Sequence, residues 1–111
     1  TVETIYAGKS SVWNLSHPIT DYDKILIMFD LVLDLGEPTV TYFEPYGSIV
    51  LDSWHLKMML LPKITMIDIP SIGSITLHGE ANDNPSTVSK IIVDWNGEPK
   101  FIRIFGLNFS D

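Results

Sequence analysis

The strongest constraint on this fold is the regular recurrence of short apolar segments, about one every 8–12 residues. Residues that favour turns, mainly Gly, Pro, Asn and Asp, separate these segments. Val, Ile and Thr supply 29 of the 111 residues, whereas Ala occurs twice and Gln is absent, so the composition favours strands over helices. We therefore expect an all-β fold, an antiparallel, jelly-roll-like β-sandwich formed by residues 1–111 as a single domain.

Period-two alternation and turn residues predict ten strands. We expect the first two to pair as a hairpin, and we expect Asn96-Gly97, a strong hairpin turn, to join the last two. Glu44-Pro45-Tyr46-Gly47 is expected to form a turn. Leu56, Met59 and Leu60 recur at helical spacing, which leaves a short helix open there, although we expect a strand. The predicted strands are residues 3–7, 11–16, 24–35, 39–43, 48–51, 54–61, 64–69, 73–79, 88–95 and 99–108.

The longest apolar segment, residues 24–35, differs between its two parities. Ile25, Ile27 and Phe29 share a parity that is entirely apolar, which predicts a buried face. The other parity begins apolar and then includes Asp30 and Asp34. We expect the strand to emerge toward solvent at these two aspartates.

Charge and missing residue types argue against several classes of function. Fourteen acidic and seven basic residues give a net charge of −7, and such a surface repels a phosphate backbone, so we expect no nucleic-acid binding. No apolar run approaches the roughly 18 residues of a membrane-spanning helix, so we expect no membrane insertion. The absence of cysteine excludes thiol chemistry. Because Thr1 begins no signal-like segment, we expect a piece excised from a longer chain.

No motif predicts catalysis. The seven glycines are scattered among the turns, no Gly-x-Ser-x-Gly sequence occurs, and the three histidines lack the close spacing of zinc ligands. We therefore expect no enzymatic activity, no metal site and no cofactor. Asp21 with Asp23, and Asp83 with its neighbouring asparagines, offer oxygen atoms of the kind that bind calcium, although turn formation explains these side chains equally well.

Carbohydrate binding requires less than catalysis does. An exposed aromatic ring stacks on a sugar face, and neighbouring polar side chains hydrogen-bond the hydroxyl groups. Each aromatic candidate has the alternative of a place in the core or at its rim, and we assign Trp13 to the core because alternating strand residues flank it. The candidate glycan-binding residues are Tyr42, Tyr46, Trp54, His55, Asp94 and Trp95.

Both ends of the chain carry a sequence pattern. The matching runs are Ile5-Tyr6-Ala7-Gly8-Lys9 followed by Trp13-Asn14-Leu15-Ser16, then Ile19-Thr20-Asp21-Tyr22-Asp23-Lys24-Ile25-Leu26-Ile27, and finally Ile102-Arg103-Ile104-Phe105-Gly106-Leu107. This pattern resembles the C-terminal domains of bacteriophage tail fibres and tailspikes. The match covers only the two ends, and Leu107 stands where the pattern has isoleucine.

The resemblance implies a non-enzymatic β-sandwich at the distal tip of a trimeric virion fibre or tailspike. Such domains serve trimer locking or recognition of a bacterial surface polysaccharide, so the implied partners are two further copies of the chain and a glycan. Leu26, Met28 and Val32, on the second parity of residues 24–35, would then line the subunit interface, although a two-sided core strand explains them as well. The alternative function is a carbohydrate-binding or accessory module of a polysaccharide-degrading enzyme whose active site lies outside this chain.

Overall fold

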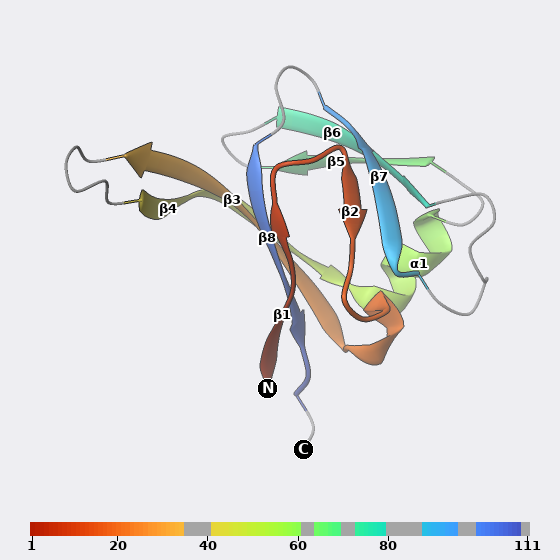
Figure 1. The fold of residues 1–111 in the computed structure, drawn as a ribbon. Helices are drawn as coiled ribbons and strands as arrows, with labels where there is room; N and C mark the ends of the chain where they lie inside the picture. The colour runs from red at the N-terminus through yellow and green to blue at the C-terminus, as the bar shows by residue number, and fades with distance from the viewer. Residues whose placement is uncertain (35–40, 61–63, 70–72, 80–87, 96–99, 110–111) are drawn as a thin grey trace.

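The computed structural model describes residues 1–34, 41–60, 64–69, 73–79, 88–95 and 100–109, and their side chains except at 31–34, 41–46, 59–60 and 64–65. The described residues form eight strands, one 3₁₀ helix and one α-helix (Figure 1). The elements are β1 (Val2–Gly8), β2 (Val12–Asn14), η1 (Ile19–Asp21), β3 (Lys24–Asp34), β4 (Thr41–Asp52), α1 (Ser53–Leu60), β5 (Ile64–Ile69), β6 (Gly73–Gly79), β7 (Lys90–Asp94) and β8 (Phe101–Leu107).

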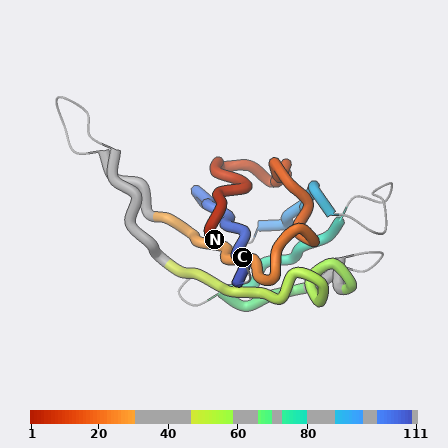
Figure 2. Tube along the Cα trace, turned by 90° about the horizontal axis from the view of Figure 1, so that it is seen from below, coloured from red at the N-terminus to blue at the C-terminus, as the bar shows by residue number. Residues whose placement is uncertain are grey.

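The strands form two four-stranded antiparallel sheets. Sheet A has the order β1-β8-β3-β4, and sheet B has the order β2-β7-β6-β5. The sheets face each other, with β1 and β2 along one side of the sandwich and β4, α1 and β5 along the other (Figure 1, Figure 2). This arrangement confirms the predicted antiparallel β-sandwich.

The core lies between the two sheets and confirms the predicted alternation. Ile25, Ile27 and Phe29 of β3 are completely buried, as are Ile102 and Ile104 of β8. The core of sheet B is built from residues that alternate in the same way along each strand. They include Ile67, Ile69, Ile75, Leu77, Ile91 and Val93.

Aromatic rings fill one part of this core. Trp13 is completely buried, as predicted. Its ring centroid lies 6.3 Å from that of Tyr6 and 6.2 Å from that of Trp95, and Trp95 packs edge-to-face on Phe29 at 5.9 Å. Such offset and edge-to-face pairs add to the free energy of apolar burial. These contacts join the two sheets, because Phe29 belongs to sheet A and Trp13 to sheet B.

The prediction that Asp30 faces solvent is wrong. Its side chain is completely buried and accepts two hydrogen bonds from Arg103, from Nε at 2.6 Å and from Nη2 at 2.8 Å. Arg103 lies 73 residues further along the chain, so period-two alternation within one strand could not reveal this partner. The side chain of Asp34 lies outside the described residues.

Both predicted hairpins are wrong. β1 pairs with β8 in sheet A, while β2 pairs with β7 in sheet B. β7 and β8 therefore also lie in opposite sheets, and Asn96-Gly97 falls outside the described residues. The core explains the crossovers, because Ile91 of β7 completes the inner face of one sheet and Ile104 of β8 that of the other. Burial on two layers outweighs the local turn preference.

Residues 54–61 do not form the predicted strand, because Ser53–Leu60 is the helix α1. Asp52 precedes the helix, and its Oδ1 accepts the backbone N–H of His55 at 2.9 Å, as an N-capping side chain does. Leu56 is buried and fixes the helix against the core. The helical spacing noted in the sequence therefore predicts this element correctly, and its Leu, Lys and Met residues also favour a helix.

The turn predicted at residues 44–47 is also wrong, since β4 runs continuously through it. The pairing with β3 instead contains a bulge. Phe29 pairs with Gly47 and Asp30 with Pro45, so Tyr46 has no partner across the pair. Proline is tolerated here because β4 is an edge strand, where a missing N–H costs no ladder hydrogen bond.

Candidate functional site

The outward-facing side chains of sheet A form a continuous apolar surface. In the register of the sheet, Leu26 of β3 lies between Phe105 of β8 and Val50 of β4, and Leu107 lies between Val2 and Lys24. These residues alternate with the core residues of the same strands, so they point away from the core. We name this surface the apolar face; it comprises Val2, Leu26, Met28, Val50, Phe105 and Leu107.

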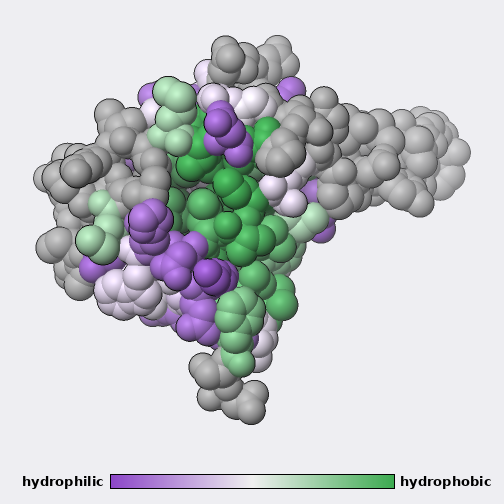
Figure 3. All heavy atoms as spheres, turned by 180° about the vertical axis from the view of Figure 1, so that it is seen from behind, coloured by the Kyte–Doolittle hydropathy of each residue, from purple (hydrophilic) through white to green (hydrophobic). Residues whose placement is uncertain are grey.

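Much of the apolar face is open to water. Val2 is 69% exposed and Val50 is 55% exposed, while Leu26 and Met28 are half-buried among their neighbours. Figure 3 shows the side along which β4 runs, where hydrophobic residues gather in the middle and hydrophilic residues border them. Two of the three predicted interface residues, Leu26 and Met28, lie together on the apolar face. The side chain of Val32 is outside the described residues.

Two ion pairs border the apolar face along the strand direction. Lys24 Nζ lies 3.7 Å from Asp52 Oδ2 at one end, and Arg103 binds Asp30 at the other. The backbone N–H of His55, and secondly the charge of Lys24, lower the pKa of Asp52. The hydrogen bond to Asp30 raises the pKa of Arg103. Both shifts favour the charged forms of Asp52 and Arg103, and each of these two groups lies beside a side chain of opposite formal charge.

The predicted glycan-binding residues whose side chains are described lie in two separate places. Trp54 is 55% exposed and lies on α1 beside the exposed His55, and Lys57 Nζ lies 4.6 Å from the centroid of the Trp54 ring. The exposed Asp94 is the last residue of β7 and the half-buried Trp95 follows it, at the end of β7 that lies away from α1 (Figure 1). The side chains of Tyr42 and Tyr46 are outside the described residues.

Trp95 is a poor sugar platform because it packs into the core. Its ring contacts Trp13 and Phe29 edge-to-face. Its Nε1 is buried and has no hydrogen-bond partner among the described residues. Of the predicted aromatic candidates whose side chains are described, Trp54 alone presents an exposed ring.

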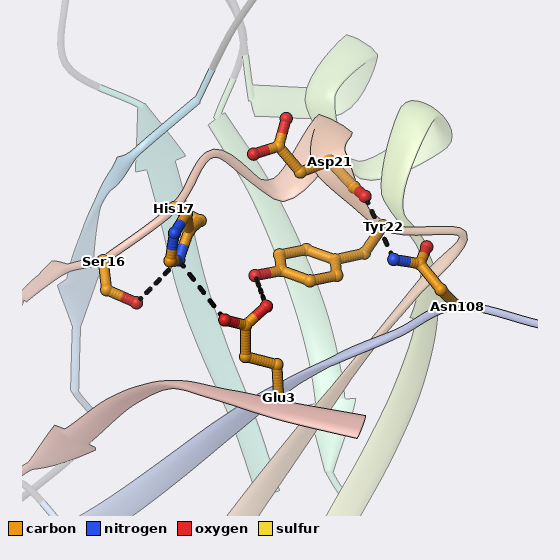
Figure 4. Close-up of polar contacts among 6 residues, drawn as sticks. All are labelled: Glu3, Ser16, His17, Asp21, Tyr22 and Asn108. Carbon is orange, nitrogen blue, oxygen red and sulfur yellow. Dashed lines mark hydrogen bonds and ion pairs between the residues drawn. The ribbon is translucent and has the colours of Figure 1, made fainter. Parts of the chain in front are cut away.

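A polar cluster that sequence reasoning missed lies near the two chain ends (Figure 4). The Tyr22 hydroxyl donates to Glu3 Oε2 at 2.7 Å, Glu3 Oε1 lies 3.9 Å from His17 Nδ1, and Ser16 Oγ lies 3.2 Å from the same nitrogen. Burial, and secondly the hydrogen bond to Glu3, raise the pKa of Tyr22. The phenol therefore remains a neutral donor. No spacing rule in the sequence relates these residues.

The geometry of this cluster is that of a structural contact between distant segments of the chain. A serine nucleophile and its orienting carboxylate must contact opposite nitrogens of the histidine ring, whereas Ser16 and Glu3 both approach Nδ1 of His17. The Tyr22 ring covers Gly106, where an added Cβ would lie 2.4 Å from the ring atoms. Glycine at this position lets the ring pack directly on the backbone of β8.

Of the candidate calcium ligands, Asp23 uses its carboxylate in a contact with the C-terminal segment, and Asp21 contributes its backbone carbonyl. The Asp23 carboxylate accepts the backbone N–H of Phe109 at 2.8 Å, and the side-chain amide of Asn108 donates to the backbone carbonyl of Asp21 at 3.3 Å. Asp83 lies outside the described residues. Within the described part of the chain, no group of three or more His, Cys, Asp or Glu side chains is arranged to hold a metal ion.

No helix among the described residues has the length and apolar character needed to cross a membrane. No protein-family model, curated protein or solved structure matches this chain. Among the surfaces described above, the apolar face differs most from the polar outer surface of an ordinary solvated sheet.

Proposed function

We propose that this chain is a non-enzymatic assembly domain of a virion fibre or tailspike, and that it forms a homotrimer through the apolar face. The observation that carries the proposal is the cluster of outward apolar side chains around Leu26 and Met28 in the centre of sheet A. Contiguous exposed apolar surface bordered by polar residues is typical of protein interfaces.

Charge favours further copies of the same chain as the partner. Chains that each carry a net charge of −7 repel one another, so they associate best through surfaces whose own charges cancel. The outward positions of sheet A with described side chains carry two positive and two negative groups, joined as the Lys24–Asp52 and Arg103–Asp30 pairs. The apolar face is thus locally neutral on an acidic chain.

The placement in a virion fibre and the number of three copies follow from the resemblance at the two chain ends. Leu26, Phe105 and Leu107 belong both to the resembling runs and to the apolar face. The proposed interface therefore coincides with a part of the sequence that carries the resemblance.

The test is the mass of the chain in solution, measured by light scattering across a dilution series. We expect a particle of three times the 12.5 kDa chain mass. Met28→Lys should convert it to a folded monomer, because a buried ammonium in the interface has no partner there. Thr76→Lys, on the outward face of sheet B, is the matched control and should remain trimeric. A wild-type chain that stays monomeric at every concentration would refute the proposal.

A second candidate function is a carbohydrate-binding module, and the exposed Trp54 ring beside His55 favours it. In this case the chain should be monomeric and should retain glycans on an array through Trp54. A trimer that binds a bacterial surface polysaccharide would combine both functions, as the resemblance implies.

A further inference from the structure

The ribbon formed by β3 and β4 extends beyond the rest of sheet A. β8 pairs with β3 from Lys24 to Asp30 only, whereas the pairing of β3 with β4 continues to Asp34 opposite Thr41. Among the described residues, no third strand pairs with the last four residue pairs of the ribbon, and the ribbon projects from the sandwich (Figure 1). We name residues 31–34 of β3 and 41–44 of β4 the arm.

A β-bulge and a buried ion pair lie at the base of the arm. The bulge at Tyr46 lies where the arm leaves the sheet, and bulges increase local twist and redirect a strand. At the same level the buried carboxylate of Asp30 in β3 binds Arg103 of β8 through two short hydrogen bonds. The ion pair ties the ribbon to the sandwich immediately before the third strand ends, so the direction of the arm is set by the sheet.

The arm is an unusual structure for an isolated domain. A two-stranded ribbon on its own is marginally stable in water, and this one contains Leu31, Val32, Leu33, Tyr42 and Phe43 in its sequence. The radius of gyration of the chain is 14.4 Å, above the roughly 13 Å of a compact domain of this length. A projecting apolar ribbon gains stability when another protein surface covers it.

We infer that in the assembled protein the arm of each copy lies against the apolar face of the next copy. This inference rests on the proposed function, because it takes a second copy of the chain as the occupant of the apolar face. The arm prolongs β3 and β4 beyond the apolar face, and the Arg103–Asp30 pair lies between the two surfaces. The apolar face is open to water at Val2 and Val50, the arm is apolar in sequence, and within the described residues the arm pairs with no third strand.

The inference specifies the symmetry of the assembly. Contact between two different surfaces of identical chains is heterologous, and it generates a ring when the rotation between copies closes. Contact of one apolar face with another would instead be isologous and would give a dimer. The arm-to-face contact thus agrees with the trimer proposed above, in which every arm and every apolar face is occupied.

The experiment uses two variants that each remove one side of the contact. In the arm-less variant, an Asn-Gly turn replaces residues 32–43 and joins the paired residues Leu31 and Glu44. The second variant is Met28→Lys on the apolar face. Each variant alone should be monomeric by light scattering. Mixed in equal amounts at high concentration, they should form a heterodimer, because the intact arm of one variant meets the intact apolar face of the other.

The outcomes distinguish a failure of the arm contact from a failure of the proposed function. A monomeric wild-type chain would overturn both. A trimeric arm-less variant would overturn the arm contact and leave the assembly intact. Two monomeric variants that do not associate on mixing would also overturn it, since the intact arm of one variant would then fail to bind the intact apolar face of the other.

A milder variant guards against misfolding of the shortened chain. Leu33→Thr with Tyr42→Thr changes two register partners in the arm and keeps strand-forming residues at both positions. It should be folded by circular dichroism and should dissociate at a concentration at least tenfold higher than the wild type. A dissociation concentration equal to that of the wild type would overturn the inference.

Discussion

The two outward faces of the sandwich differ, although the inward faces of both sheets are uniformly apolar. Sheet B presents mainly polar side chains to water, among them Asn14, Thr76, His78, Lys90 and Asp94. At the corresponding outward positions, sheet A presents the apolar face between two ion pairs. The outward parity of sheet B is that of a sheet exposed to solvent, whereas the outward parity of sheet A is that of a sheet covered by protein.

The difference shows that the outward side chains of a β-sandwich, and not its inward ones, reflect its partners. Every strand of a sandwich needs an apolar inward parity, because the inward side chains form the core. The outward parity has no such requirement, so its polarity reflects what lies outside the domain. Sheet B also has outward apolar residues, namely the register partners Val12 and Ile92 and the 67% exposed Met66, but the polar Thr76 and His78 of β6 lie between Met66 and that pair. A contiguous group such as the apolar face is the informative case.

The largest effect should come from the ion pair that borders the apolar face. Asp30→Ala removes two charge-assisted hydrogen bonds to a buried carboxylate, and we expect it to lower the free energy of unfolding by about 2–3 kcal/mol. The matched change on sheet B is Asp68→Ala, which removes an exposed carboxylate that accepts a hydrogen bond from Ser74. It should cost about 0.5 kcal/mol or less. Urea denaturation measures both, and equal losses would contradict the contrast between the faces.

An intermediate effect is expected at the two edge strands. Val50 in β4 and Met66 in β5 are both exposed apolar residues, one on each outward face. Val50→Thr should raise the dissociation constant of the assembly about tenfold, the equivalent of roughly 1.4 kcal/mol of lost apolar burial. Met66→Thr should leave it unchanged. Sedimentation across a dilution series distinguishes them, and a greater effect at Met66 would move the interface to sheet B.

The smallest effect on the fold should come from Trp54, which belongs to neither face. Trp54→Ala should change the free energy of unfolding by about 0.5 kcal/mol or less, because more than half of the side chain is already exposed. If the ring stacks on a sugar, glycan affinity should fall about fivefold, or roughly 1 kcal/mol. Phe109→Ala, at another exposed aromatic residue, is the control. Unchanged glycan retention by Trp54→Ala would remove α1 as a binding surface.

Sequence reasoning performed best where the signal lies within one strand. Alternation identified the buried residues Ile25, Ile27 and Phe29, and it placed Trp13 in the core. The candidate interface residues Leu26 and Met28 follow from the opposite parity, so the centre of the apolar face was also accessible from the sequence. The alternative was a strand buried on both faces. Only the structure argues against it, because Val50 and Val2 on the outward side of sheet A remain exposed.

Sequence reasoning failed where two distant segments decide the outcome. Asn96-Gly97 predicts a tight turn, yet β7 and β8 belong to different sheets. Asp30 is acidic and was expected in water, but Arg103 neutralises it inside the protein. The helix α1 has only eight residues, so its period is hard to recognise in a chain that is otherwise rich in strand-forming residues, and its start depends on the cap supplied by Asp52.

The sequence by itself determined that this chain forms strands, which side of the longest strand is buried, and that the opposite side is apolar enough to meet another protein. These properties follow from the alternation of side chains along a strand, which needs no other part of the chain. Only the tertiary structure decided the partner of each strand, the burial of Asp30 and the length by which the arm outreaches β8. Those features depend on register between segments up to a hundred residues apart, where hydrogen bonding between strands and burial between sheets act together.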